Sequence, residues 1–204
     1  MDDRVFRWVN HLADRTQWLH GIATNYAVWG VGLSALFLVL AWLDARTADD
    51  PPRAVAAVTW AGAAALVGAL AVQLIGAPID RARPTAVLAG THLLLDRTSD
   101  FSFPSDHGTA TAAIAVGLLL AGPHLRRRWY GWAALGVAVL MDLDRVYVGA
   151  HYPTDVIAGL VLGSLVAVLF AKPATHLLAA ITRRIATTPL GQLVSVAPSP
   201  RPDA

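Results

Sequence analysis

The sequence contains no cysteine, no glutamate and only one lysine, Lys172. The absence of cysteine excludes disulfides, thiolate metal sites and cysteine nucleophiles. All fourteen acidic residues are aspartates, so chemistry that requires a glutamate base is excluded as well. No glycine-rich loop leads into Lys172, which excludes a P-loop. An enzyme with this sequence has to work with histidine, aspartate, arginine and serine.

Charged residues are also scarce. They make up 15% of the 204 residues, whereas a typical soluble domain carries about 25%. Apolar residues make up 55%, and the mean hydropathy is +0.51. The formal net charge of +2 is too small to indicate a nucleic-acid partner. This composition indicates an integral membrane protein whose surroundings are the lipid bilayer.

Long runs without charge predict transmembrane helices. Runs of 28, 26 and 19 residues follow Arg15, Arg53 and Asp106, and about 20 mostly apolar residues cross the hydrocarbon. Two shorter runs, of 13 and 16 residues, can also cross the hydrocarbon if the side chains of Arg128 and Lys172 extend to the membrane–water interface. No segment alternates like a barrel strand, so the predicted fold is an all-α helical bundle. Its five predicted spans are 24–43, 54–77, 107–122, 129–144 and 154–171.

The segments outside the spans are predicted to differ from each other. Residues 1–20 are predicted to form an amphipathic interfacial helix, because apolar residues recur at i, i+3, i+4 and i+7 from Val5. The transmembrane domain then covers residues 21–171. Residues 172–204 are predicted to be a loose cytoplasmic tail.

Loop charges indicate the orientation. With five spans, the loop 44–53, the arginine cluster 126–128 and the tail share one side and hold nine basic residues, against seven on the other side. The richer side is assigned to the cytoplasm. The polar segments 80–106 and 142–155 then face the outer side.

Three polar clusters lie in these outer segments. Asp80-Arg81-Ala82-Arg83-Pro84 follows one span, Phe103-Pro104-Ser105-Asp106-His107-Gly108 opens another, and Asp144-Arg145 is followed by His151 and Asp155. Because separate spans deliver the clusters to one end of the bundle, a single site can gather them.

The clusters resemble the motifs of the type 2 phosphatidic acid phosphatase (PAP2) superfamily, which shares a core with vanadium haloperoxidases. The first family motif is a lysine followed, after six residues, by Arg-Pro, and Arg83-Pro84 fits its second part. The second motif is Pro-Ser-Gly-His, and Pro104–His107 fits it with Asp in place of Gly. Arg145, His151 and Asp155 fit the third motif, with Asp144 in place of Ser. The Pro-Ser-Asp-His-Gly variant resembles the bacterial undecaprenyl-diphosphate phosphatase branch. The position of the first motif's lysine is occupied by Gly76.

The spacing of His151 and Asp155 suits a nucleophile and its orienting acid. A helix that begins near Pro153 places Asp155 one turn beyond His151, where it accepts the Nδ1–H and leaves Nε2 free. A neutral imidazole attacks phosphorus without a metal, and the resemblance implies a phosphohistidine intermediate. An isolated His-x-x-x-Asp is more often a histidine paired with a helix-capping aspartate. Arg145 and the other motifs favour catalysis here.

Ser105, Asp106 and His107 open the third span. Ser105 is a natural N-cap and Asp106 suits a first turn, while a helix N-terminus also binds anions. Ser105 is expected to donate to a phosphate oxygen, and His107 to protonate the leaving oxygen. Asp106 is grouped with the phosphate pocket. Whether it caps the helix, pairs with an arginine such as Arg97 or tunes His107 is left open.

Arg83 and Arg145 are the predicted phosphate clamps, because the guanidinium fork matches phosphate oxygens. Arg81 or Arg97 is a candidate for the charge that the missing lysine would supply. Asp144 is a candidate partner for Arg81. Three histidines outside the motifs, His92, His124 and His176, are interpreted as surface residues.

The resemblance implies a lipid phosphatase of the bacterial inner membrane, without metal or cofactor, that hydrolyses undecaprenyl or another polyprenyl diphosphate at the outer face. The alternatives are a phosphatidic acid or phosphatidylglycerol phosphate phosphatase, and a homologue that binds lipid phosphate with weakened turnover. A zinc hydrolase is disfavoured because no His-Glu-x-x-His spacing is present. A transporter is disfavoured because no charge lies mid-span. A homodimer is left open.

Overall fold

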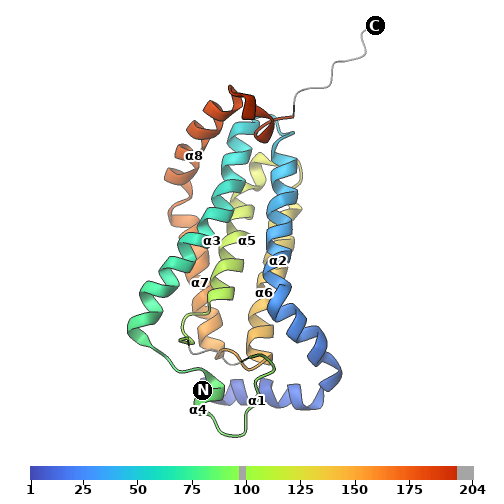
Figure 1. The fold of residues 1–204 in the computed structure, drawn as a ribbon, viewed down its shortest axis with the longest axis vertical. Helices are drawn as coiled ribbons and strands as arrows, with labels where there is room; N and C mark the ends of the chain where they lie inside the picture. Colours follow the sequence, from blue (N-terminus) through green and yellow to red (C-terminus); the bar gives the residue numbers. More distant parts are fainter. Residues whose placement is uncertain (97–99, 197–204) are drawn as a thin grey trace.

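The computed structural model describes residues 1–96 and 100–196, and every regular element in this part of the chain is helical (Figure 1). Five long helices form the bundle: α2 (His20–Ala45), α3 (Pro51–Ile79), α5 (Asp106–Ala121), α6 (Trp129–Tyr147) and α7 (Pro153–Leu169). They coincide with the five predicted spans. The shorter elements are α1 (Asp2–Arg15), η1 (Gln17–Leu19), α4 (Pro84–Val87), η2 (Gly122–His124), α8 (Ala171–Ala186) and η3 (Pro189–Leu193).

Helix α5 lies at the centre of the bundle and packs against α3, α6 and α7. The contact surfaces consist mainly of alanine and glycine; Ala61, Ala115 and Ala134 have no exposed surface. A Cβ at Gly163 of α7 would overlap the backbone of Thr109 on α5. Small residues allow helix backbones to approach closely, which is how membrane helices gain contact without a hydrophobic driving force between them.

The outer surface of the bundle is apolar, as a bilayer requires. Leu66, Leu70 and Leu74 on α3 expose two thirds or more of their surface. Within the described residues, Gln17–Ala45 and Pro51–Val87 are long and apolar enough to span a membrane. The pair α7 and α8, bent by 54°, makes a third if it is one span. The chain is therefore a helical membrane protein, and the count of five spans stays a prediction.

The N-terminal segment forms the predicted amphipathic helix. Helix α1 lies across one end of the bundle (Figure 1), with Phe6 buried against the ring of Tyr152. The Asn10 amide donates to the carbonyl of His92 (2.8 Å) and accepts from its backbone N–H (2.9 Å). These contacts attach α1 to the α4–α5 loop, so it covers the end of the bundle where the polar clusters lie.

The prediction of a loose tail from residue 172 is wrong for its first half. Residues 171–186 form α8, whose buried Thr182 donates to the carbonyl of Pro52 on α3 (2.7 Å). The sequence 171–186 has apolar and polar residues at helical spacing, and Ala174 and Leu178 pack against the cluster that contains Trp60 and Ala64 of α3. Residues 197–204 of this segment lie outside the described residues.

Candidate active site

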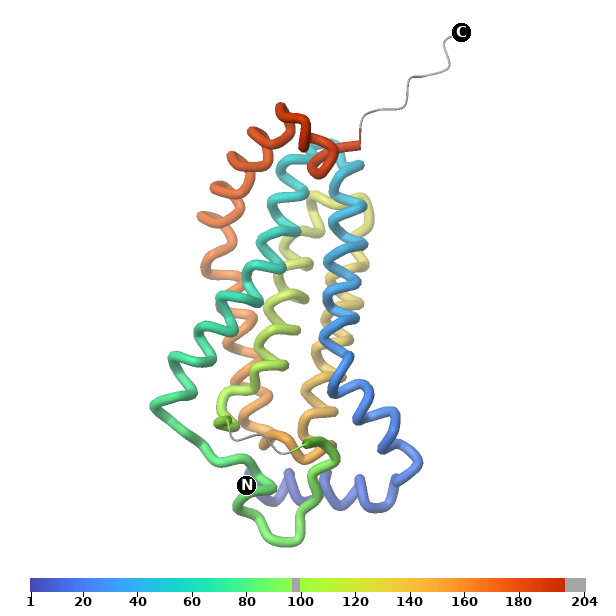
Figure 2. The backbone as a smooth tube through the Cα atoms, in the orientation of Figure 1, coloured from blue at the N-terminus to red at the C-terminus, as the bar shows by residue number. Residues whose placement is uncertain are grey.

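The three polar clusters converge at the end of the bundle that α1 covers. His151 lies in the short loop between α6 and α7. This loop runs beside the segment that leads from α3 to α5 (Figure 2). His151 is 1% exposed. Its Nδ1 donates to the carbonyl of Ser102 (2.8 Å), and Arg83 Nη1 donates to its Nε2 (3.3 Å). The imidazole is therefore held in the tautomer whose Nε2 carries a lone pair.

The surroundings of His151 keep the imidazole neutral. Burial, together with the positive charges of Arg83 and Arg145, lowers its pKa to about 3. Asp106, whose Oδ1 lies 3.9 Å from Nε2, opposes that shift. A neutral, oriented imidazole beside two guanidiniums has the properties of a nucleophile toward an anionic group.

Asp155 does not accept the Nδ1–H of His151, contrary to the prediction from their spacing. Its Oδ2 lies 3.9 Å from Nδ1 and accepts from the Ser102 hydroxyl (2.5 Å) and the Tyr152 backbone N–H (3.0 Å). Tyr152 is the N-cap of α7, so the carboxylate folds back toward the helix N-terminus and caps it. Asp155 thus orients Ser102, and the carbonyl of Ser102 orients His151. Ser102 belongs to none of the three motifs, and no local pattern marks it.

The prediction that Arg81 binds phosphate conflicts with the contacts of its guanidinium, which is already paired with two carboxylates. Its Nη1 donates to Asp155 Oδ1 (2.5 Å), and its Nη2 donates to Asp2 Oδ2 (2.6 Å). The guanidinium also stacks on Tyr152, 3.9 Å from the ring centroid. Burial opposes the charged form, but the two carboxylates raise the pKa of Arg81 above its usual value. Arg81 is a partner of carboxylates.

The N-terminal residue Asp2 is the partner that sequence reasoning missed. Besides Arg81, it accepts from the Thr154 hydroxyl (2.6 Å) and from the Thr154 backbone N–H (3.2 Å). Asp2 therefore joins α1 to the first turn of α7, which carries Asp155. The predicted pairing of Asp144 with Arg81 is wrong: Asp144 Oδ2 is buried and has no hydrogen-bond partner in the described residues.

Arg83 contacts His151, and Arg145 lies close enough for its charge to act on the same ring. Arg83 is 11% exposed; it donates to the carbonyl of Ala150 (3.0 Å) and pairs with Asp100 (3.1 Å). Arg145 is buried, and Nη1 makes a long hydrogen bond to the carbonyl of Ala27 (3.4 Å). Its buried Nε has no partner within residues 1–96 and 100–196. An unsatisfied buried guanidinium nitrogen is a group that a bound anion would satisfy.

Ser105 caps α5 as predicted, because its Oγ accepts from the Gly108 backbone N–H (3.2 Å). The geometry also decides the partner of Asp106. Asp106 Oδ1 accepts from the ring Nδ1 of His107 (2.9 Å) and from its backbone N–H (2.8 Å). Asp106 therefore orients His107, and as a carboxylate it does not belong with the phosphate-binding groups. Arg97, the other candidate partner, lies outside the described residues.

No group of three or more histidines and aspartates in the described ranges is placed to hold a metal ion. Besides the carboxylates and Arg81, this end gathers the imidazoles of His107 and His151 and the guanidiniums of Arg83 and Arg145. This set can bind a tetrahedral anion and supply a nucleophile and a proton donor.

The comparison with protein families agrees with this arrangement. The PAP2 superfamily matches residues 56–176, which is more than half of the chain. The chain belongs to the PAP2 superfamily. Undecaprenyl-diphosphatase BcrC of Bacillus subtilis is 29% identical over 172 residues, covering 84% of this chain and 83% of the relative. The putative undecaprenyl-diphosphatase YbjG of Escherichia coli is 30% identical over 78% of this chain and 75% of the relative.

The fold is also that of a solved PAP2 protein. The PAP2 type phosphatidylglycerolphosphate phosphatase of Bacillus subtilis superposes with a TM-score of 0.61 at 22% identity, over 90% of this chain and 85% of that structure. This likeness concerns the arrangement of helices.

One position departs from the PAP2 motifs in a way that the structure explains. Gly76, in the last turns of α3, stands where the first motif has lysine. A Cβ at this position would overlap the ring of Phe101. Phe101 thus fills the space beside α3 into which a longer side chain at position 76 would extend. A lysine at this position would require Phe101 to move.

Proposed function

We propose that this PAP2 protein is a lipid diphosphatase that hydrolyses undecaprenyl or another polyprenyl diphosphate to the monophosphate and phosphate, at the outer face of the bacterial inner membrane. The observation that carries the proposal is the neutral, buried His151, whose Nε2 faces Arg83. The relatives named undecaprenyl-diphosphatase, similar over most of their length, support the choice of substrate.

The reaction begins with attack of His151 Nε2 on the terminal phosphorus. The bond from phosphorus to the bridging oxygen breaks, and the lipid monophosphate leaves with the bonding electrons. The phosphoryl group stays on the histidine as a phosphohistidine until water displaces it. The Ser102 carbonyl holds the Nδ1–H throughout and stabilises the positive charge that develops on the ring.

Arg83 and Arg145 supply the electrostatic part of catalysis. In phosphoryl transfer the negative charge spreads over the three equatorial oxygens, and fixed cations in a dry site stabilise it. Arg83 already contacts Nε2, so an oxygen of the attacked phosphate lies within its reach. The free Nε of Arg145 offers a second donor.

His107 is the proposed proton donor. The Asp106 carboxylate accepts a hydrogen bond from its Nδ1 and so orients the ring, which leaves Nε2 to face the leaving oxygen. A leaving lipid monophosphate has a second pKa of about 6, so it depends little on this proton. An alkoxide from phosphatidic acid is a far poorer leaving group. A site that lacks the motif lysine is therefore better suited to a diphosphate.

A substrate panel tests this function. Detergent-solubilised protein is expected to release phosphate from farnesyl diphosphate faster than from a short-chain phosphatidate, and to keep this activity in excess chelator. The reason is that nucleophile, clamps and proton donor are all side chains of this protein. Faster release from the phosphatidate would favour the phosphatidic acid alternative, and loss of activity in chelator would contradict the metal-independent mechanism.

Asp2 is expected to act on catalysis through the chain Asp2–Arg81–Asp155–Ser102–His151. The Asp2→Asn variant is expected to lower kcat by about tenfold, or ~1.4 kcal/mol, with KM unchanged. The physical reason is that Arg81 loses one of its two carboxylates and holds Asp155 less firmly. Steady-state kinetics with farnesyl diphosphate measure the effect.

The adjacent Asp3 is exposed and provides the matched control. Asp3→Asn is expected to leave kcat unchanged. In an Asp155→Asn background, Asp2→Asn is expected to have no further effect, because the chain is already broken. Additive losses in the double variant would show that Asp2 acts independently of Asp155.

A further inference from the structure

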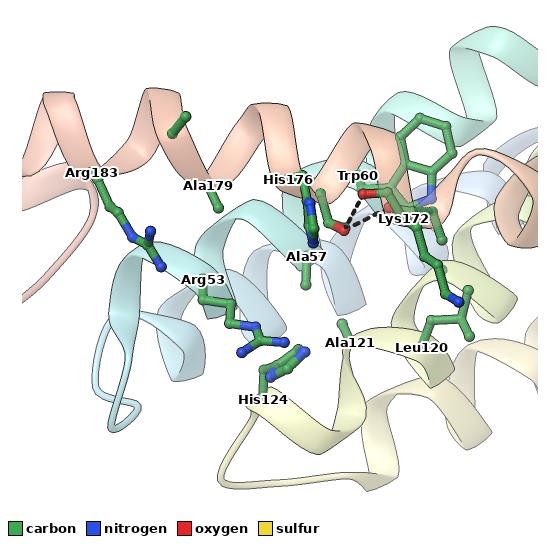
Figure 3. A pocket seen from close by; sticks show the side chains of 14 residues that line it. Arg53, Ala57, Trp60, Leu120, Ala121, His124, Lys172, His176, Ala179 and Arg183 are labelled. Atoms are coloured by element: carbon green, nitrogen blue, oxygen red, sulfur yellow. Dashed lines mark hydrogen bonds between the residues drawn. The ribbon is translucent and has the colours of Figure 1, made fainter.

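A polar cavity lies at the end of the bundle opposite the candidate active site. It has a volume of about 610 Å³ and opens between α3, α5 and α8 (Figure 3). Helix α5 separates the two sites, because Asp106 at its start belongs to the catalytic end whereas Ala121 at its end lines this cavity. At about 1.5 Å per residue, its 16 residues hold the two ends roughly 24 Å apart.

The cavity is basic at its rim and apolar at its wall. Five basic or imidazole side chains line it, from three separate elements: Arg53 of α3, His124 of η2, and Lys172, His176 and Arg183 of α8. The wall is formed by Trp60, Ala57 and Leu120. The Trp60 indole N–H already donates to the carbonyl of Ala167 (2.9 Å), so the ring serves as an apolar surface.

Within the described residues, the positive groups of this cavity are not paired with carboxylates in salt bridges. No aspartate of this part of the chain lines the cavity. Burial and the Arg53 guanidinium lower the pKa of His124, and only Asp50, the N-cap of α3, opposes the shift. The Arg53 guanidinium and the His124 ring lie side by side (Figure 3). A bound anion would relieve the repulsion among these groups.

We propose that this cavity binds a phosphate-bearing anion, and specifically the headgroup of an anionic lipid in the leaflet opposite the catalytic end. Guanidinium and ammonium donors match phosphate oxygens. The apolar wall beside them suits the first carbons of the lipid chains. The cavity also lies at an end of the helical bundle, which is where lipid headgroups meet the ends of membrane-spanning helices. A solvated basic surface would need neither a cavity nor a tryptophan wall.

Thermal unfolding in detergent, followed by tryptophan fluorescence, tests the proposal. Phosphatidylglycerol is titrated against purified protein, phosphatidylcholine serves as the neutral lipid, and inorganic phosphate forms a third arm. We expect phosphatidylglycerol to raise the Tm of the wild type and phosphatidylcholine to leave it unchanged. The triple variant Arg53→Gln, Lys172→Gln, Arg183→Gln is expected to need a phosphatidylglycerol concentration at least about tenfold higher for the same rise in Tm.

The triple variant Arg126→Gln, Arg128→Gln, Arg184→Gln is the matched control. It removes the same charge, and none of its residues lines the cavity. It is expected to respond as the wild type does. Ala180 also lines the cavity, so Ala180→Trp fills it without a change of charge and is expected to lose the response even if the first triple variant does not fold.

If the two triple variants lost the Tm response to phosphatidylglycerol equally, the proposal would be overturned, because the lipid would then be attracted to the basic surface as a whole. An equal response to both lipids would overturn it too. If inorganic phosphate also raised the Tm of the wild type and not that of the cavity variants, the phosphate site would be supported. The phosphate group would then be sufficient for binding without the lipid chains. The readout does not depend on catalysis, so failure here leaves the proposed phosphatase function untouched.

Discussion

The His151→Gln variant is expected to lose at least about 10⁴-fold in kcat/KM for farnesyl diphosphate, because removal of a nucleophile leaves only binding and electrostatic stabilisation. Substrate labelled in its terminal phosphate is expected to label the wild-type protein with an acid-labile, base-stable phosphoryl group. The variant is expected to remain unlabelled. Labelling of the variant at the wild-type level would place the nucleophile elsewhere.

The same variant is expected to change the dependence of stability on pH. The pKa of His151 is lowered to about 3 in the folded protein, whereas an unfolded histidine has a pKa near 6.5. Between these values the unfolded state binds more protons, so stability is lost as the pH falls from about 6.5 toward 3. His151→Gln removes this contribution. Its Tm is expected to fall less than that of the wild type between pH 7 and pH 4; parallel curves would contradict a neutral, buried His151.

Replacing Arg145 with Gln is expected to lower kcat/KM by about 10³-fold, within the range found for cations that stabilise transferring phosphoryl groups. Arg145→Lys is expected to recover only a small part, since an ammonium cannot form the two parallel hydrogen bonds of a guanidinium. Arg145 is buried and its Nε lacks a partner in the described residues. Its loss therefore removes a transition-state contact and few contacts of the resting protein.

A measurement of Tm distinguishes a catalytic role of Arg145 from a structural one. Because a buried charge with incomplete partners costs free energy, the Tm of Arg145→Gln is expected to be no lower than that of the wild type. A large loss of Tm together with the loss of activity would indicate that Arg145 holds the fold. Arg83 is less suitable for this comparison, because its contacts with Ala150 and Asp100 also support the loop.

The sequence was sufficient to predict the five long helices, though not α8, and to place the polar clusters at one end of the bundle. The charge-free runs match α2, α3, α5, α6 and α7, because the length and apolar character of a helix are carried by consecutive residues. The N-cap role of Ser105 was predictable for a similar reason: its partner, Gly108, is three residues away. The family was recognisable from motifs whose members are also close in sequence.

Only the tertiary structure decided how the side chains around His151 are connected. Ser102 lies 49 residues from His151 and 53 from Asp155, and Asp2 lies 79 residues from Arg81. Such contacts depend on how the α3–α5 segment and α1 cross the end of the bundle, which no local spacing encodes. The same holds for Phe101 against Gly76, and for His124 and His176, which were interpreted as surface residues and line a cavity once α8 packs beside α3. Periodicity and capping act within a few residues, whereas a site is made by residues that folding brings together.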